Sequence, residues 1–356
     1  MTTKQKTKIF IILISVVFLG ASCNPLRKVE TAGIVKTVNG GADWQFSNIF
    51  KDETQGTLNP YAISKIALNP HHREVVYASS YNLGIAKSDD SGASWYSILS
   101  KVGVYDFAID PNNSNVMYAA GFFGTFGKLL KTTDGGASWV EVYNEQGAEN
   151  PVRSVSINPN NTSQVLIGTA SGSIIKSADG GGSWILATNL SDRVQRIIWQ
   201  NNSVYVLTRT KGLFKGTGFA ESFENISKSL ARDINFSSLT YRTEGVEAFN
   251  QFYLDPFSSS LIYLATSNGV YKTTNEGGVW ELLKLPIKEG ESNARAIYIA
   301  RSSSNIVFTS VGSTIYKSLD GGDSWQTQGI ATNGFVNYIL VDPELPQIVY
   351  AGVYIE

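Results

Sequence analysis

A nine-residue phrase recurs along this chain of 356 residues, and it limits the possible folds more than any other feature. Six of the seven tryptophans close a copy of it, and each copy fits Lys-[Ser/Thr]-x-[Asp/Asn]-x-Gly-x-x-Trp. The six copies are KTVNGGADW (36–44), KSDDSGASW (87–95), KTTDGGASW (131–139), KSADGGGSW (176–184), KTTNEGGVW (272–280) and KSLDGGDSW (317–325). Such regular self-similarity predicts a repeat architecture.

The spacing of the copies predicts the kind of repeat. A seventh, degenerate copy, KGTGFAESF (215–223), keeps the register through Lys215 and Phe223. The copies then follow one another about every 45 residues, which is typical of a propeller blade of four strands. Within one unit, the segments 104–111, 116–122, 128–134 and 138–143 are β-branched, aromatic and separated by turn formers. We therefore expect an all-β chain of four-stranded antiparallel blades.

The two ends of the chain predict how the ring closes. Residues 334–356 form a first and a second strand, whereas residues 32–46 form a third and a fourth strand. Together they complete one blade, so that the N-terminal and C-terminal strands pair in a single sheet and no strand edge is left open there. We expect a single seven-bladed β-propeller over residues 32–356.

The recurring phrase is interpreted as structural. At a hairpin between the third and fourth strands, the Asp or Asn side chain accepts hydrogen bonds from backbone N–H groups two residues on. The glycine supplies a positive φ, and the tryptophan is buried between neighbouring blades. The lysines are expected to form a ring of surface charge. The structural positions are Asn39, Trp44, Asp90, Trp95, Asp134, Trp139, Asp179, Trp184, Asn275, Trp280, Asp320 and Trp325.

The first residues have the pattern of an export signal. Lysines precede an apolar run at 9–20, which is short for a membrane-spanning helix. Small residues and then Cys23, the only cysteine, follow, and this resembles a bacterial lipoprotein signal. The resemblance implies a signal peptide at 1–22, a lipidated Cys23 with a tether over 23–31, and an anchored protein in the periplasm or on the cell surface. An ordinary cleaved signal with an incidental cysteine is the alternative.

The recurring phrase also resembles the Asp-box, or BNR repeat. That repeat is found in bacterial sialidases, in the sortilin receptor domain, in xyloglucan-cleaving hydrolases and in photosystem II assembly-factor-like proteins. The resemblance covers most of the chain and implies the propeller fold. It implies no single function, because these families bind and cleave different molecules.

Three segments on the face opposite the recurring phrase are longer than the repeat requires: 46–61, 122–128 and 228–245. Exposed aromatic residues beside arginines are typical of a protein or sugar interface. The alternative is that these side chains cap the central channel or pack on neighbouring blades. The candidate binding face consists of Phe122, Phe123, Phe126, Arg232, Tyr241 and Arg242, with Phe50, Lys51 and Asp52 in the first segment.

The sequence contains no clear catalytic set, and it leaves open whether the chain is an enzyme. A glycosidase needs two facing carboxylates, for which the weak candidates are Asp106 and Asp233, with Asp52, Asp192 and Glu247 behind them. Asp106 lies early in an innermost strand, where a solvated channel residue is the favoured interpretation. The arginines at 153, 196, 209, 232, 242, 295 and 301 have no spacing that requires them to cluster, and the Arg-Ile-Pro stretch of sialidases is absent.

Composition excludes some classes of partner and ligand. The chain has 29 basic and 30 acidic residues and no basic footprint for nucleic acid. His71 and His72 are adjacent, with no third ligand nearby, so we expect neither a metal nor a cofactor. The favoured function is a non-catalytic scaffold for another envelope or extracellular protein, bound to the membrane only through its lipid. The alternative is a carbohydrate-active propeller, either a glycoside hydrolase or a glycan-binding protein.

Overall fold

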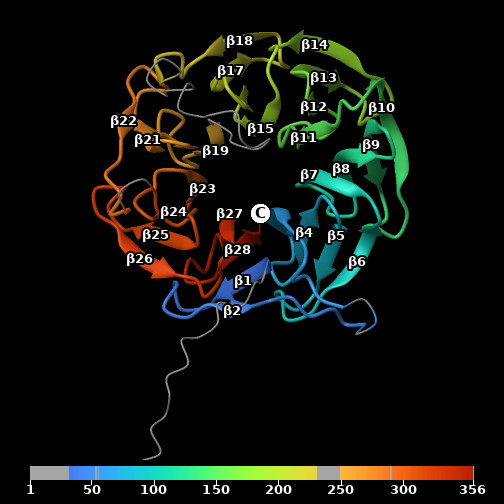
Figure 1. The fold of residues 1–356 in the computed structure, drawn as a ribbon. Coiled ribbons are helices and arrows are strands. Elements are labelled where there is room, and N and C mark those ends of the chain that lie inside the picture. Colours follow the sequence, from blue (N-terminus) through green and yellow to red (C-terminus); the bar gives the residue numbers. More distant parts are fainter. Residues whose placement is uncertain (1–31, 53, 55, 231–248, 289–290, 356) are drawn as a thin grey trace, which may run out of the picture.

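The computed structural model describes residues 32–52, 54, 56–230, 249–288 and 291–355. Its strands form seven four-stranded antiparallel sheets arranged as a ring (Figure 1). The region that the innermost strands surround is called here the central channel. The expected all-β, seven-bladed β-propeller is thus confirmed. None of the described residues belongs to a helix with the length and apolarity that crossing a membrane would require.

Each blade is numbered here by the order of its innermost strand in the chain. Blade 1 comprises β3 (Ile63–Leu68), β4 (Val76–Ser80), β5 (Gly84–Ser88) and β6 (Tyr96–Ser100). Blade 2 comprises β7 (Gly103–Ile109), β8 (Met117–Phe123), β9 (Phe126–Thr132) and β10 (Val140–Ala148). Blade 3 comprises β11 (Val152–Ile157), β12 (Val165–Thr169), β13 (Ser173–Ser177) and β14 (Ile185–Asn189).

The remaining blades follow the same plan. Blade 4 comprises β15 (Val194–Gln200), β16 (Ser203–Thr208), β17 (Leu213–Thr217) and β18 (Ser222–Asn225). Blade 5 comprises β19 (Phe249–Leu254), β20 (Ile262–Thr266), β21 (Gly269–Thr273) and β22 (Glu281–Leu282). Blade 6 comprises β23 (Ala294–Ile299), β24 (Val307–Val311), β25 (Thr314–Ser318) and β26 (Gln326–Gly329). Blade 7 comprises β27 (Phe335–Val341), β28 (Val349–Tyr354), β1 (Gly33–Thr37) and β2 (Gln45–Phe46).

Blade 7 closes the ring as predicted. β1 pairs antiparallel with β28, with Val35 opposite Ala351, so strands from the two ends of the chain share one sheet. The second strand of each blade is covered on both faces by its neighbours. In β12, for example, all five residues are buried, which explains its unbroken run of apolar and small side chains. The hydrophobic clusters accordingly lie between adjacent blades.

Antiparallel strands give the ring two distinct faces. One face, called the mouth face, carries the connections between blades and the turns between second and third strands, such as residues 81–83 and 124–125. The other, called the repeat face, carries the turns of the recurring phrase, such as residues 133–138. The two faces therefore present different loops to any partner.

The turn of the recurring phrase is locked differently from the expectation. The Asp134 carboxylate accepts from the backbone N–H of Ser138, four residues on rather than two, at 2.9 Å. Thr132 Oγ1 donates to the same carboxylate at 2.7 Å and accepts from the N–H of Gly136 at 3.0 Å. Gly136 has φ of 99°, which other residues rarely adopt. The hydroxyl and the carboxylate thus act as one unit. The same four-residue bond recurs at Asn39, Asp90, Asp179, Asn275 and Asp320.

Four of the tryptophans that end the phrase connect their blade to the preceding one through a hydrogen bond. Trp95 is completely buried, and its indole N–H donates to the backbone oxygen of Ser47 at 2.8 Å. Trp139 is half-buried and donates in the same way to Ile98 at 2.9 Å. Trp184 and Trp280 repeat this contact with the blade before theirs. These four indoles combine apolar packing with a directed bond across a blade boundary, whereas the buried indole nitrogens of Trp44 and Trp325 have no hydrogen-bond partner among the described residues.

The lysines of the phrase do not form the expected ring of free surface charge. Lys131 Nζ donates at 2.7 Å to the backbone oxygen of Gly180, in the repeat turn of the next blade. The Tyr118 hydroxyl donates to the same oxygen at 2.8 Å, and the ammonium lies 5.3 Å from the centre of the Tyr118 ring. Burial raises the pKa of Tyr118 to about 12, so the hydroxyl keeps its proton. Lys36 and Lys272 make the equivalent bonds.

Candidate functional site

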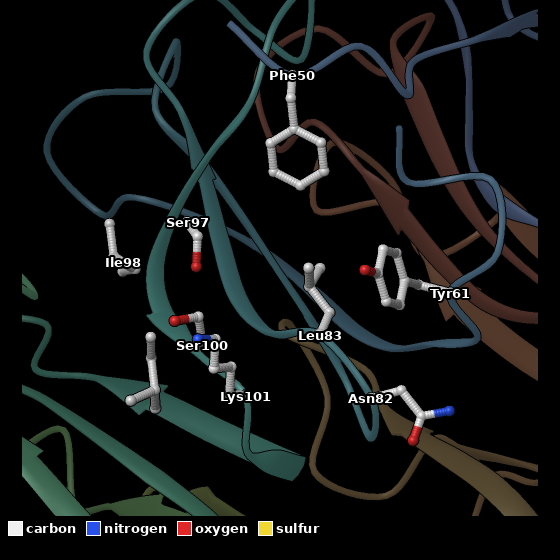
Figure 2. A pocket seen from close by; sticks show the side chains of 9 residues that line it. Phe50, Tyr61, Asn82, Leu83, Ser97, Ile98, Ser100 and Lys101 are labelled. Atoms are coloured by element: carbon white, nitrogen blue, oxygen red, sulfur yellow. The ribbon is translucent and has the colours of Figure 1, made fainter. Parts of the chain in front are cut away.

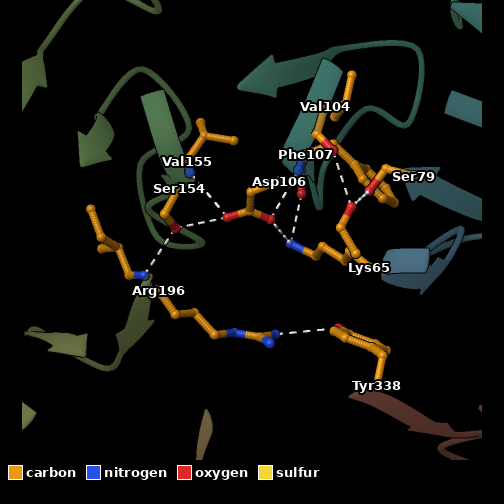
Figure 3. Close-up of polar contacts among 11 residues, drawn as sticks. Lys65, Ser79, Val104, Asp106, Phe107, Ser154, Val155, Arg196 and Tyr338 are labelled. Atoms are coloured by element: carbon orange, nitrogen blue, oxygen red, sulfur yellow. Dashed lines mark hydrogen bonds and ion pairs between the residues drawn. The ribbon is translucent and has the colours of Figure 1, made fainter. Parts of the chain in front are cut away.

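The innermost strands line the channel, and each has a β-bulge near its start. One unpaired residue shifts the register of each innermost strand. The first paired residues after these bulges are Lys65, Asp106, Ser154, Arg196, Gln251, Ala296 and Tyr338. A bulge redirects the side chains on both sides of it. These seven residues form one level of the channel wall, called here the central layer. Figure 3 shows five of them, Lys65, Asp106, Ser154, Arg196 and Tyr338, between the innermost strands.

Asp106 belongs to this layer, and its carboxylate is saturated. One oxygen accepts from Lys65 Nζ at 2.7 Å and from the backbone N–H of Phe107 at 2.9 Å. The other accepts from Ser154 Oγ at 2.7 Å and from the N–H of Val155 at 3.0 Å (Figure 3). Four bonds fill the lone-pair positions of a carboxylate. With 7% exposure, Asp106 is not the solvated residue expected from the sequence.

The same layer ties neighbouring blades together through side chains. Ser154 Oγ also accepts from the backbone N–H of Ile197 in blade 4 at 3.0 Å. Gln251 Oε1 likewise accepts from the N–H of Ile297 in blade 6 at 2.8 Å. These bonds satisfy backbone donors that no ladder partner reaches at a blade boundary. The channel wall is therefore held by polar contacts as well as by packing.

Arg196 crosses the channel. Its guanidinium donates to the hydroxyl oxygen of Tyr338 at 3.3 Å, joining β15 of blade 4 to β27 of blade 7 (Figure 3). Burial lowers the pKa of Arg196, but Tyr338 and Asp106 outweigh this effect, and the pKa lies above its usual value. The side chain is therefore a permanent cation within the channel.

The channel wall also carries a pair of tyrosines, two residues beyond the central layer on β19 and β23. The rings of Tyr253 and Tyr298 are 4.4 Å apart, centre to centre. Burial raises the pKa of both hydroxyls, so they remain neutral donors. Arg301 interacts electrostatically with both tyrosines. Two residues further along their strands than the central layer, three other blades present small side chains instead: Ala67, Ala108 and Ser156.

The mouth face carries an aromatic stack that the sequence analysis missed. The rings of Tyr81 and Tyr105 are 5.2 Å apart, and the Arg153 guanidinium lies 3.9 Å from the centre of Tyr105. Tyr81 is 44% exposed and forms the open end of the stack. Tyr105 and Arg153 both occupy bulge positions, which only the register shift of the folded sheet reveals.

Beside Tyr81, the mouth face has a depression of about 500 Å³. The aromatic rings of Phe50 and Tyr61 stand on two sides of it, and Leu83 lies between them (Figure 2). The turn between β4 and β5, the outer strand of blade 1 and the residue after that strand form the remaining wall. The lining residues of this wall are Asn82, Ser97, Ile98, Leu99, Ser100 and Lys101. The depression thus combines an apolar floor with hydroxyl groups and one ammonium.

Phe50 is a buried residue of the segment 46–61, whereas Lys51 and Asp52 are exposed. Phe50 is 3% exposed and bridges to Trp95 in a parallel arrangement, so it belongs to the core of blade 1. The backbone N–H of Lys51 donates to the oxygen of Trp95 at 2.8 Å. The alternative reading, packing on a neighbouring blade, therefore holds for Phe50.

The phenylalanines of the segment 122–128 lie on lengthened strands rather than in a loop. β8 and β9 continue to Phe123 and Phe126, which are opposite one another across a two-residue turn. Phe126 is 37% exposed, whereas Phe122 and Phe123 are half-buried. The other candidates, Arg232, Asp233, Tyr241, Arg242 and Glu247, lie outside the described residues, as does Cys23.

The remaining candidates make local contacts. Asp192 accepts from the backbone N–H groups of Thr210 and Lys211 at 2.6 and 2.7 Å. The N–H groups of His71 and His72 donate to Asn69 Oδ1, which fixes a turn on the repeat face. Within the described ranges, no three His, Cys, Asp or Glu side chains gather closely enough to hold a metal ion.

Comparison with known proteins gives similarity in fold only. No family model matches the chain, and no curated protein matches it. Among solved structures it is similar to the GH74 xyloglucanase from Xanthomonas campestris, with a TM-score of 0.66 and 14% identity. That match covers 83% of this chain but 51% of the xyloglucanase, so the chain spans about half of that enzyme.

Two further similar structures are more nearly of the same extent as this chain. YCF48 bound to D1 peptide has a TM-score of 0.59 and 15% identity, covering 83% of this chain and 93% of that one. YCF48 from Cyanidioschyzon merolae has a TM-score of 0.60 and 11% identity, covering 82% and 95%. At these identities the comparisons establish the seven-bladed fold and leave the function open.

Proposed function

We propose that this propeller is a non-catalytic platform that binds another protein through its mouth face. The observation that carries the proposal is the depression lined by Phe50, Tyr61 and Leu83, with the exposed ring of Tyr81 beside it. Aromatic side chains at the edge of an apolar depression are the usual anchors of protein interfaces. Lys101 at the rim adds a charge for orientation.

The state of the candidate carboxylates supports a role without catalysis. A hydrolytic acid or base needs an oxygen that can reach the substrate. Both oxygens of Asp106 are filled by protein donors, and Asp192 holds two backbone N–H groups. These carboxylates serve the fold.

The extents of the similar structures point the same way. YCF48 in complex with D1 peptide is nearly covered by this chain, at 93%, and that protein binds a peptide with a fold of this extent. Only 51% of the xyloglucanase is covered. The seven-bladed ring of this chain therefore matches nearly the whole of the peptide-binding structure and about half of the hydrolase.

We further propose that the protein is exported and anchored by a lipid on Cys23. The described chain starts on the mouth face, where the backbone N–H of Ala32 donates to the oxygen of Asn59 at 3.0 Å. Residues 24–31 would span at most roughly 30 Å when fully extended. Such an anchor would hold the mouth face towards the membrane, so the expected partner is a membrane protein or a protein at the membrane surface.

Affinity capture from the native envelope tests this function. The tagged wild-type protein is compared with Tyr81→Ala combined with Lys101→Ala, and with the control Leu319→Ala, whose side chain is 53% exposed on the repeat face. We expect one protein to be retained by the wild type and the control and lost from the double variant. A protein retained equally by all three would contradict binding at this face.

The alternative, a carbohydrate-active propeller, is favoured by the likeness to the xyloglucanase fold. It predicts that the wild type is retarded on immobilised xyloglucan or another glucan and that Tyr81→Ala is not. Hydrolysis of the glucan would additionally require a carboxylate other than Asp106, because both oxygens of Asp106 accept hydrogen bonds from the protein. Asp106→Asn would then leave the activity in place.

A further inference from the structure

Arg196 has more donors than the described protein satisfies. A guanidinium carries five N–H donors in a planar fork. Among the described residues, the only hydrogen bond from this side chain goes to Tyr338, whose ring centre lies 5.6 Å from the guanidinium carbon. Most of the fork therefore has no acceptor among the described residues.

Within the part of the chain that the structure describes, no carboxylate forms a close ion pair with Arg196. Asp106 is the carboxylate that acts on it electrostatically, but Lys65 forms the close ion pair with Asp106 at 2.7 Å. Backbone and hydroxyl donors occupy the remaining positions of that carboxylate. The described central layer thus holds two cations and one anion. A partly buried charge without a partner is costly, and an anion in the channel would offset that cost.

The channel wall beside Arg196 keeps some solvent exposure. Arg196 itself is only half-buried. Ala67, Ala108 and Ser156, two residues beyond central-layer positions on β3, β7 and β11, also retain solvent exposure. Side chains two residues apart on a strand point to the same side. These three side chains are small, so they take up little space on that side of the wall.

Tyr338 supplies a second donor at the same place. Its hydroxyl oxygen accepts the bond from Arg196, and its own proton has no acceptor among the described residues. A hydroxyl can accept and donate at once. One oxygen of an incoming anion can therefore take the tyrosine proton while the guanidinium fork binds the other.

We propose that the channel binds an oxyanion between the Arg196 guanidinium and the Tyr338 hydroxyl. A planar or tetrahedral group with two adjacent oxygens, such as a carboxylate or a phosphate, matches the bidentate fork, whereas a halide does not. The site lies in the channel wall and not in the depression beside Tyr81, so it does not depend on the proposed function. Its ligand is either a free inorganic anion or the carboxylate of a larger molecule.

Isothermal titration at low ionic strength tests the site with inorganic phosphate and, separately, with acetate. The wild type is compared with Arg196→Gln, Tyr338→Phe and the control Arg73→Gln, an exposed arginine that pairs with Asp342 and Glu344. We expect affinity to fall about tenfold or more in Arg196→Gln and several-fold in Tyr338→Phe, and to stay unchanged in the control. Phosphate binding without acetate binding identifies a free inorganic anion, and the reverse identifies a carboxylate.

Two results would overturn the proposal. One is a wild type that binds neither anion up to about 10 mM. The other is an Arg196→Gln variant that binds as tightly as the wild type. If Arg196→Gln does not fold, Arg196→Lys keeps the charge without the fork, and it is expected to bind more weakly than wild type. Partner capture through Tyr81 is measured separately, so failure of the anion site and failure of the platform are distinguishable.

Discussion

The Arg196 guanidinium donates a hydrogen bond to the Tyr338 hydroxyl oxygen at 3.3 Å, across the channel from blade 4 to blade 7. The two residues are 142 positions apart in the chain. A propeller with such a contact has its opposite sides coupled directly, in addition to the bonds between adjacent blades. This coupling belongs to a polar network in which Lys65, Asp106 and Ser154 connect the innermost strands of blades 1 to 3.

In the ion pair of Lys65 and Asp106, loss of the carboxylate should destabilise the fold more than loss of the ammonium. Asp106→Ala leaves the largely buried Lys65 ammonium without its counter-ion, although it keeps the bond to the Phe107 oxygen, and leaves three protein donors without an acceptor, so we expect a loss of about 3–5 kcal/mol in the free energy of unfolding. Lys65→Met should cost less, because Asp106 keeps its other three donors. Urea unfolding of both single variants and the double variant measures the coupling. Equal losses in the two single variants would contradict this account of the network.

The tryptophans should differ in their contribution to stability according to burial. Trp95→Ala removes a completely buried indole and should cost about 3–5 kcal/mol in the free energy of unfolding. Trp139→Ala removes a half-buried indole and should cost less. Leu319→Ala, on the exposed surface, is the matched control and should be nearly neutral. The urea midpoints of the three variants give the ranking. If Trp139→Ala had the same midpoint as Leu319→Ala, the role of Trp139 in holding neighbouring blades together would be contradicted.

The repeat turns should lose stability in acid. The Ser138 hydroxyl and N–H, together with Thr132, hold the pKa of Asp134 well below its usual range. A depressed carboxyl pKa stabilises the fold above the unfolded-state value of about 3.9, and the contribution disappears as pH falls through the folded-state pKa. Thermal melts of the wild type and Asp134→Asn should therefore differ at pH 7, and the difference should narrow progressively as the pH falls below about 4. A difference in melting temperature that is as large at pH 3 as at pH 7 would show that the charge of Asp134 does not contribute to stability.

The lysines should matter where they cross a blade boundary. Lys131→Met removes the bond to the Gly180 oxygen in the next blade and should cost about 1 kcal/mol. Lys87 instead pairs with Asp89 of its own turn at 3.2 Å, so Lys87→Met should cost less. Thermal melts at matched salt compare the two. A larger loss in Lys87→Met would refute the inter-blade role.

The sequence predicts the ring of blades, but it does not predict which side chains form the proposed binding surface. Blade number and closure follow from spacing, because each blade is a local unit and β1 and β28 complete one another's pattern. The side chains that cross blade boundaries could not be predicted, since Lys131 and Gly180 belong to different repeats. Tyr105 and Arg153 were missed because a β-bulge sets their direction, and the two readings for Phe50 stayed open because its contact with Trp95 forms only in the folded blade.

Site-specific photo-crosslinking in the native envelope tests the central claim most directly. A photoreactive benzoylphenylalanine replaces Tyr81 on the mouth face in one variant and Leu319 on the repeat face in the other, and both are irradiated in intact cells. The account predicts a light-dependent adduct of one defined protein from position 81 and none from position 319. An adduct from position 319 alone, or identical adducts from both positions, would contradict a binding platform on the mouth face.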